Sequence, residues 1–238
     1  MTLALSILNT VVRAIVRTIC KVDDSDLAKI PPKGPLILVG NHVNFLDGPL
    51  VFSHLAPRPI QTLVKIETWD NFLIGGMFTI WRAIPIRRGE VDLTALQKAR
   101  EALAKGNILL IAPEGTRSET GQLLRGRPGV ILLAMRTNYP LQPVGFFGSD
   151  VLMDNLRHLR QTPFHFRVGN PFRLIPDVRS PSKEERQQIV DEIMYQIAAL
   201  LPPKYRGVYS DLENATENFL AFEPGVTSNL QIARTAEG

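Results

Sequence analysis

The stretch PLILVGNHVNFLDG, residues 35–48, decides how the chain folds and where its chemistry lies. Its apolar part, Leu36 to Val39, has the length and composition of a buried strand. His42 follows the end of this strand, and Asp47 comes five residues later. A carboxylate across such a turn can hold an imidazole in one tautomer, and an imidazole so held can take a proton from a bound hydroxyl. The stretch therefore predicts a strand that leads into a general base.

The composition is that of one ordinary globular domain. The chain has 238 residues, of which 45% are hydrophobic and 21% are charged, and this is enough for one sizeable core. Five of the 23 acidic residues and one of the 27 basic residues lie from Asp211 onward, so residues 1–210 carry 26 bases and 18 acids. This positive surplus suits anionic ligands or an anionic membrane surface. The single cysteine, Cys20, excludes an intrachain disulfide and a multi-cysteine metal site.

Residues 3–20 predict an amphipathic helix, because polar and cationic side chains recur at helical spacing along one stripe of an otherwise apolar segment. Arg13 and Arg17 lie inside the segment and would be costly at the centre of a bilayer, which argues against a membrane span. We expect the helix to lie in the membrane interface, with its arginines toward headgroups and its leucines and isoleucines toward acyl chains. A helix packed on the core of its own domain is the alternative.

After a breaker at residues 31–34, strand-like and helix-like segments alternate. We expect strands at residues 36–39, 60–66, 83–86, 108–112, 141–147 and 164–168, and helices at residues 92–105, 128–137 and 182–201. Ser182 and Glu185 form a capping box that opens the last helix. The alternation predicts an α/β domain with a largely parallel central sheet flanked by helices. The chain then divides into an amphipathic segment with a linker (1–32), an α/β domain (33–210) and an acidic, loosely ordered tail (211–238).

Two further stretches follow predicted strands and favour anions. In PEGTRS, residues 113–118, Gly115 permits close backbone approach, and Arg117 offers a planar fork that suits phosphate oxygens. IPIRR, residues 84–88, ends in paired arginines, of which one is expected to enter a site because neighbouring strand residues point to opposite faces. A tight turn and a solvated strand end are the alternatives. Each of these stretches could therefore bind a phosphate at the end of a strand.

Taken together, the blocks resemble the glycerolipid acyltransferase family, typified by bacterial 1-acylglycerol-3-phosphate (lysophosphatidate) acyltransferases. Asn41, His42 and Asp47 match the first block, IPIRR the second and PEGTRS the third. YPLQPV at residues 139–144 is similar to the fourth block, and LPPKYRG at residues 201–207 is similar to a tail segment of bacterial members. Arg82 stands where the family usually has glycine, and Ala112 stands where an aromatic residue is commoner. The likeness covers about residues 33–210.

The resemblance implies an enzyme that transfers a fatty acyl group from acyl-CoA or acyl-carrier protein to the free hydroxyl of lysophosphatidate, giving phosphatidate. His42 and Asp47 would be its catalytic dyad, and Asn41 and Pro143 would have structural or donor-side positions. The residues expected to bind the acceptor are Arg88, Glu114, Gly115, Thr116, Arg117 and Lys65. No metal and no cofactor besides the acyl co-substrate are expected. The expected partners are a phospholipid surface, the lysophospholipid acceptor and the acyl donor, without nucleic acid, and the expected location is peripheral, on the cytoplasmic face of a membrane.

Several alternatives remain open at this level. The same chemistry could act on glycerol-3-phosphate, another lysophospholipid or an amino-lipid. A lipid-binding membrane protein without catalysis and a thioester hydrolase are alternatives from other classes, and Ser53 beside His54 is a remote candidate for an acyl-enzyme nucleophile. The aromatic, apolar run at residues 69–81 could line an acyl-chain tunnel, enter lipid or belong to the core.

Overall fold

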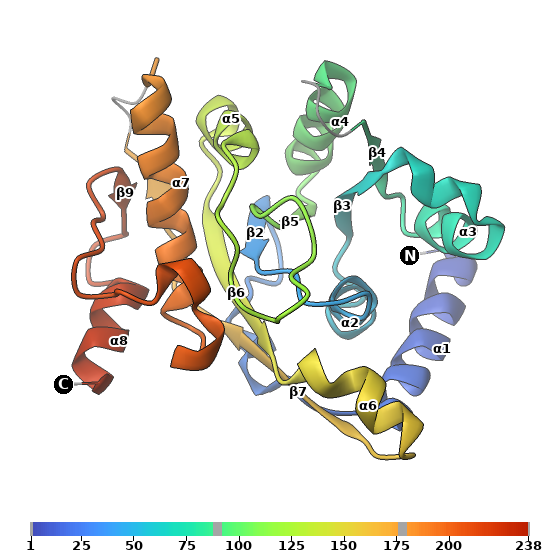
Figure 1. The fold of residues 1–238 in the computed structure, drawn as a ribbon. Coiled ribbons are helices and arrows are strands. Elements are labelled where there is room, and N and C mark those ends of the chain that lie inside the picture. Colours follow the sequence, from blue (N-terminus) through green and yellow to red (C-terminus); the bar gives the residue numbers. More distant parts are fainter. Residues whose placement is uncertain (1, 88–91, 176–179, 238) are drawn as a thin grey trace.

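The chain folds around one twisted sheet (Figure 1). The computed structural model describes residues 2–87, 92–175 and 180–237. Within these ranges, seven strands form a sheet in the order β1-β7-β6-β2-β5-β3-β4. The strands are β1 (Cys20–Asp23), β2 (Leu36–Gly40), β3 (Ile60–Lys65), β4 (Ile84–Ile86), β5 (Ile108–Ile111), β6 (Leu141–Phe147) and β7 (Thr162–Val168). Strands β2 to β6 pair in parallel, and β7 runs antiparallel to β6. The predicted α/β fold with a largely parallel sheet is confirmed.

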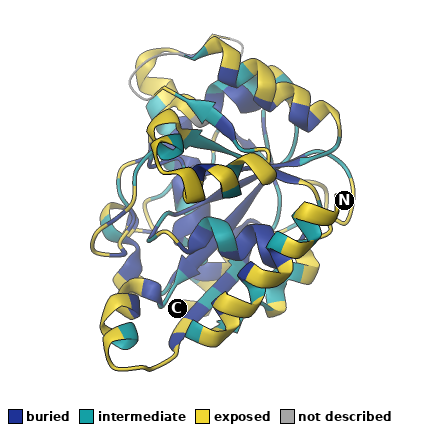
Figure 2. Cartoon of the chain, turned by 90° about the vertical axis from the view of Figure 1, so that its right-hand side faces the viewer, coloured by how far each residue is buried: buried dark blue, intermediate teal, exposed yellow. Residues whose placement is uncertain are grey.

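Helices cover both faces of this sheet. They are α1 (Leu3–Ile19), α2 (Asp47–His54), α3 (Phe72–Ile80), α4 (Leu93–Ala104), α5 (Gly129–Thr137), α6 (Leu152–Arg157), α7 (Lys183–Ala198) and α8 (Asn229–Glu237). Alternate residues of β2 point to opposite faces, so Ile37 packs in one hydrophobic cluster with α4, α5 and α7, while Leu38 packs in another with α1 and α2. Figure 2 shows the buried strands behind the more exposed outer helices. The predicted capping box at Ser182 and Glu185 is present at the start of α7.

The first helix, α1, both packs on the domain and leaves an apolar stripe exposed. Val12 and Val16 are buried in the cluster beneath it. On another side of the helix, every fourth position carries an exposed apolar residue. These residues are Leu3, Ile7, Val11 and Ile15. Arg13 departs from the predicted headgroup orientation, because its Nε donates to the carbonyl oxygen of Ser53 at the end of α2, 3.0 Å away. Among the described residues, no helix combines the length and the apolarity that crossing a bilayer requires.

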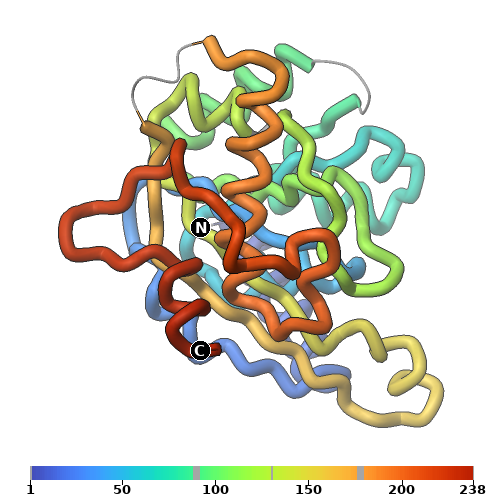
Figure 3. Tube along the Cα trace, turned by 60° about the vertical axis from the view of Figure 1, so that its left-hand side comes forward, coloured from blue at the N-terminus to red at the C-terminus, as the bar shows by residue number. Residues whose placement is uncertain are grey.

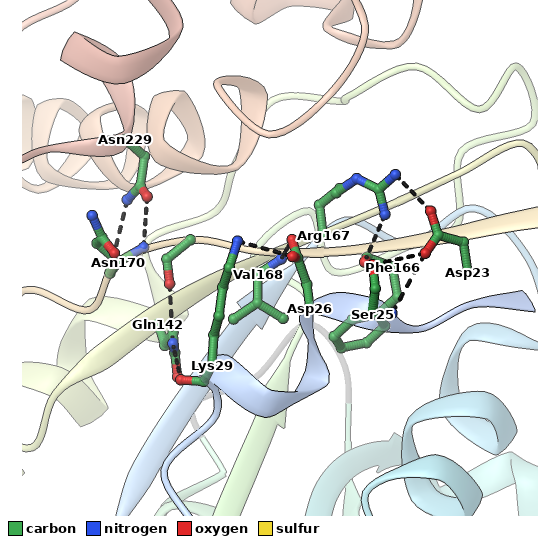
Figure 4. Close-up of polar contacts among 11 residues, drawn as sticks. Asp23, Ser25, Asp26, Lys29, Gln142, Phe166, Arg167, Val168, Asn170 and Asn229 are labelled. Carbon is green, nitrogen blue, oxygen red and sulfur yellow. Dashed lines mark hydrogen bonds and ion pairs between the residues drawn. The ribbon is translucent and has the colours of Figure 1, made fainter.

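A polar network ties the segment after α1 to the edge of the sheet (Figure 4). Asp23 accepts from the guanidinium of Arg167 on β7 at 2.7 Å, and this contact holds the pKa of Asp23 well below its usual range. Asp26 accepts the backbone N–H of Val168 at 3.2 Å. The side-chain amide of Gln142 on β6 donates to the carbonyl of Lys29 at 3.2 Å. The chain that leaves α1 is therefore held along β6 and β7 before it enters β2.

The segment from residue 211 differs from the loosely ordered tail that its composition predicted. It wraps along α7 (Figure 3), and it adds β9 (Leu220–Ala221), which pairs with β8 (Arg173–Leu174), and helix α8. Leu212, Leu220 and Leu230 are buried in the core cluster that α7 contributes to. Glu192 of α7, itself buried, accepts from the backbone N–H groups of Asn218 and Phe219. The acidic composition was misleading because a few well-spaced leucines and one buried carboxylate suffice to fix the segment.

Candidate active site

The predicted blocks meet at one edge of the sheet. β2 pairs with β5, β5 with β3 and β3 with β4, all in parallel, so the carboxyl ends of these strands lie together. Residues 41–47 follow β2, residues 112–118 follow β5, and Lys65 ends β3. Ligand sites of open α/β sheets lie at this edge. The second block reaches the same edge through the exposed Arg87 after β4, while Arg88 lies outside the described residues.

His42 and Asp47 form a dyad in direct contact. Nδ1 of His42 lies 2.8 Å from Oδ2 of Asp47, the first residue of α2. The same carboxylate oxygen accepts the backbone N–H of Val43 at 2.7 Å and of Asn44 at 2.9 Å. Three donors on one oxygen fix the position of the carboxylate. Because Nδ1 then carries the proton that it donates to Asp47, Nε2 carries the lone pair with which the imidazole can act as a base.

The loop that carries His42 is held from several sides. The side-chain amide of Asn41 donates to the carbonyl of Phe146 at 2.8 Å and accepts the N–H of the same residue at 2.7 Å, so it prolongs the pairing of β2 with β6. The carbonyl of His42 accepts the N–H of Ser118 from the third block at 2.8 Å. The amide of Asn44 donates to the carbonyl of Ser149, just before α6, at 3.1 Å. These bonds give the loop one conformation and give Asn41 a structural position.

Glu114 occupies a different place from the acceptor-binding one that its motif suggested. The side chain is buried, with 1% of its surface exposed. Oε2 accepts the backbone N–H of His42 and Oε1 accepts the backbone N–H of Leu124, each at 2.8 Å. Burial raises the pKa of this carboxyl to about 7, against the lowering effect of the two hydrogen bonds. With both oxygens engaged by backbone donors, Glu114 connects the dyad loop to the turn that follows the third block.

The exposed cations at this edge are available to an anion. Arg117 and Lys65, which the family resemblance suggested as ligands of the acceptor, are both exposed. Gly115 has a φ of 69°, a left-handed conformation that glycine adopts without cost, and its N–H donates to the carbonyl of Ala112. Thr116, the next residue, is partly exposed. The turn therefore presents Arg117 and the hydroxyl of Thr116 within one short segment.

Arg127 belongs to this group of cations, although sequence reasoning missed it. Its backbone N–H donates to the carbonyl of Pro113 at 2.8 Å. Its side chain lies across Gly115, so that a Cβ on that glycine would be 3.2 Å from Cδ of Arg127. The absence of a side chain at Gly115 thus makes room for an arginine nine residues beyond the third block. No local spacing signals this contact, because it depends on how the intervening turn folds back.

Three other singled-out residues have positions that bear on their expected roles. Pro143 is buried within β6, opposite Val39 in the register, and contacts the backbone of Gly169, so it lies inside the sheet rather than at its edge. Ser53 is fully buried within α2, where its hydroxyl lies 3.0 Å from Nδ1 of His54, and a substrate cannot reach it there. Arg82 has a φ of 56°, so the chain keeps the left-handed conformation for which glycine is usual at this point.

The family model described as Acyltransferase matches residues 21–146, more than half of the chain. The chain belongs to the acyltransferase family. The resemblance predicted from the four sequence blocks is thereby confirmed at the level of the family, and the matched residues include the dyad, Lys65 and the third block.

Relatives of this acyltransferase chain carry two kinds of name. A 1-acyl-sn-glycerol-3-phosphate acyltransferase of Chlamydomonas reinhardtii is 26% identical over 184 residues, which cover 76% of this chain and 53% of that protein. A lyso-ornithine lipid O-acyltransferase of Pseudomonas aeruginosa is 31% identical over 187 residues, which cover 71% of each chain. The chain spans about half the length, or less, of several curated relatives that it matches.

A solved structure shares the fold. The crystal structure of the 1-acyl-sn-glycerophosphate (LPA) acyltransferase PlsC from Thermotoga maritima superposes with a TM-score of 0.56 at 22% identity, covering 79% of this chain and 76% of that one. At this identity the likeness concerns the fold, and it supports the arrangement of a largely parallel sheet between helices.

Proposed function

We propose that this chain transfers a fatty acyl group from a thioester donor, acyl-CoA or acyl-carrier protein, to the free hydroxyl of lysophosphatidate. The observation that carries the proposal is the 2.8 Å contact between His42 and Asp47 at the carboxyl edge of the sheet, beside the exposed cations Lys65 and Arg117. Membership of the acyltransferase family and relatives named for 1-acyl-sn-glycerol-3-phosphate acylation support it.

In the proposed mechanism, Asp47 holds His42 with its Nε2 lone pair toward the acceptor hydroxyl. Nε2 takes the hydroxyl proton while the oxygen attacks the thioester carbonyl carbon, and the carbonyl electrons move onto oxygen. When the carbonyl re-forms, the carbon–sulfur bond breaks, and the thiolate leaves with the proton from the imidazolium. The N–H groups of Val43 and Asn44 donate hydrogen bonds to Asp47 and cannot also bind the oxyanion. The N–H of Gly115 donates to the carbonyl of Ala112, so we expect the oxyanion donors to be the N–H groups of Thr116 and Arg117.

The acceptor headgroup would lie against the cations of the neighbouring strand ends. Arg117 and Arg127 are exposed side chains on the segment that follows β5, and Lys65 is exposed at the end of β3. Arg88 remains a candidate from the second block. Replacing Arg117 by alanine should raise KM for a phosphate-bearing acceptor about tenfold or more, because a charge-assisted contact contributes about 1.5–3 kcal/mol. An unchanged KM for lysophosphatidate would count against this role.

Lyso-ornithine lipid is the second candidate acceptor, since a relative with that name matches 71% of this chain at 31% identity. A panel of lysophosphatidate, lyso-ornithine lipid and glycerol-3-phosphate, each with acyl-CoA and with acyl-carrier protein, separates these possibilities. Wild-type protein should acylate lysophosphatidate at the highest kcat/KM. Transfer to lyso-ornithine lipid without transfer to lysophosphatidate would reassign the substrate but not the chemistry.

Variants of the dyad separate catalysis from lipid binding. His42→Ala should lower kcat at least about a hundredfold with little change in acceptor binding, and Asp47→Asn should lower it strongly because the amide cannot hold the same tautomer as firmly. A protein without catalysis would keep its cellular function with His42→Ala. A thioester hydrolase would release free fatty acid from the donor when no acceptor is present.

We further propose that the chain works on a membrane surface, as a peripheral protein. The stripe of Leu3, Ile7, Val11 and Ile15 on α1 is exposed, and on α3 Phe72 and Leu73 are 88% and 79% exposed. The side chain of Trp81, just after α3, donates to Asn9 of α1 at 2.8 Å, so the two helices form one unit. Apolar side chains left exposed on adjoining helices are typical of segments that enter the headgroup and acyl boundary. Of the roles considered for residues 69–81, entry into lipid fits this exposure better than a place in the core.

A further inference from the structure

The turn between α6 and β7 contains a leucine in an unfavourable conformation. Helix α6 ends at Arg157, and Leu159 follows with a φ of 52°. The N–H of Arg160 donates to the carbonyl of Asn155 at 2.8 Å, which is the bond that closes a helix through a left-handed residue. Glycine and asparagine meet this need at lower cost, because a Cβ with a long side chain crowds the carbonyl in the left-handed region.

Leu159 gains nothing within its own chain that would offset this cost. Its surface is 97% exposed, so its isobutyl group buries no apolar area against the domain. Two further apolar side chains nearby in the sequence are also exposed, Val151 just before α6 and Met153 within it. An unfavourable backbone conformation that presents an apolar side chain to solvent is explained when something outside the chain covers that side chain.

The surroundings of Leu159 indicate what could cover it. Arg157 and Arg160 flank it and are exposed, so an apolar tip is framed by two arginines. The turn projects at one extremity of the molecule (Figures 1 and 3). It also adjoins the end of α1, because the side-chain amide of Gln161 donates to the carbonyls of Arg17 and Thr18, each at 3.1 Å. An apolar tip framed by arginines, next to a helix with an exposed apolar stripe, is complementary to a bilayer with anionic headgroups.

We propose that the α6–β7 turn is a second contact of this chain with an anionic lipid bilayer, separate from the unit of α1 and α3. Leu159 enters the acyl boundary, and Arg157 and Arg160 bind headgroup phosphates. The inference rests on the membrane association proposed above. Two contacts at separate elements would fix the tilt of the domain on the surface. The hydrogen bond from Asn44 to the carbonyl of Ser149, just before α6, connects this second contact to the loop that carries the dyad.

Replacing Leu159 by asparagine tests the proposal, since it changes stability and binding in opposite directions. Asparagine tolerates the left-handed conformation, so the melting temperature of Leu159→Asn should rise by about 1–4 °C. Partition onto vesicles of phosphatidylcholine with phosphatidylglycerol should fall about three- to tenfold, because burial of a leucine side chain is lost. Ile232→Asn is the matched control, since Ile232 is an exposed apolar residue of α8, away from α1 in Figure 1, and it should leave partition unchanged.

The variant Ile7→Asp, on the stripe of α1, distinguishes failure of this inference from failure of the proposed membrane association. If Ile7→Asp loses vesicle binding and Leu159→Asn keeps it, the second contact is refuted and the first stands. If both variants bind like the wild type, both proposals are wrong. If Leu159→Asn binds vesicles normally but raises KM for acyl-carrier protein and not for acyl-CoA, the turn contacts a protein, and the bilayer assignment is overturned.

Discussion

Replacing Glu114 by glutamine should change the pH dependence of stability in a way that the structure makes calculable. The wild-type carboxyl has its pKa raised by burial to about 7, from an ordinary value of 4.5 in the unfolded chain. Between these two values the native state holds the proton more firmly than the unfolded state. The free energy of unfolding therefore decreases as the pH rises through this window, and it levels off above about pH 7. The decrease amounts to about 3 kcal/mol.

Glutamine at position 114 removes the pH dependence of stability that the carboxyl causes, and it weakens the hydrogen bonding of the site. Its oxygen can still accept one of the two N–H groups, from His42 or from Leu124, but its amino group faces the other donor. Relative to the wild type with Glu114 protonated, the lost hydrogen bond and the unpaired donor should lower the free energy of unfolding by about 1–3 kcal/mol. Glu114→Gln should therefore be less stable than the wild type at pH 5 and equally stable or more stable at pH 8. Because the loop of His42 loses one of its attachments, kcat should fall tenfold or more throughout.

Urea unfolding at pH 5, 6, 7 and 8, combined with initial rates, measures both effects. Equal m-values for the two proteins would show that their denatured states are alike. Glu119→Gln is the matched control for the loss of one carboxylate, because Glu119 is exposed on the same turn. A stability difference between wild type and Glu114→Gln that stays constant from pH 5 to pH 8 would refute the assignment of a buried, titrating carboxyl at this position.

Three further variants test other parts of the structure. Arg82→Gly should raise the melting temperature by about 1–4 °C. Relief of the left-handed conformation stabilises the fold by about 1–2 kcal/mol, which exceeds the conformational entropy cost of a glycine, about 0.5–1 kcal/mol. A lower melting temperature would show that Arg82 makes a compensating contact. Ser53→Ala should keep kcat within about twofold, since the hydroxyl is buried within α2, and a complete loss of activity in a folded protein would revive the acyl-enzyme route. Glu192→Ala should lower the free energy of unfolding by about 3–5 kcal/mol and expose residues 211–237 to proteolysis, because the backbone N–H groups of Asn218 and Phe219 lose their acceptor. Unchanged protease resistance would contradict this.

The elements that could be predicted from the sequence are those that local patterns specify. The apolar runs of β2, β5 and β6 were placed within two residues, because a buried strand needs a short apolar run bounded by breakers. The dyad was also predictable, since His42 and Asp47 are five residues apart on one turn and need no distant segment to meet. Composition, by contrast, misled for the last 28 residues, where buried leucines rather than net charge decide the packing.

Only the tertiary structure decided which groups surround the dyad. Glu114 lies 72 residues from His42 along the chain, and the motif alone could not tell an acceptor ligand from an attachment point of the loop. Arg127 reaches Gly115 because the turn after the third block folds back. Arg13 faces α2, and not outward as its place in the sequence predicted, because the C-terminus of α2 lies within its reach. Parallel pairing of β2, β5 and β3 brings these distant segments to one edge. The sequence by itself identified His42 and Asp47 as candidate reacting groups. Their burial, their partners and the pKa of Glu114 depend on contacts between distant segments that only the folded sheet brings together.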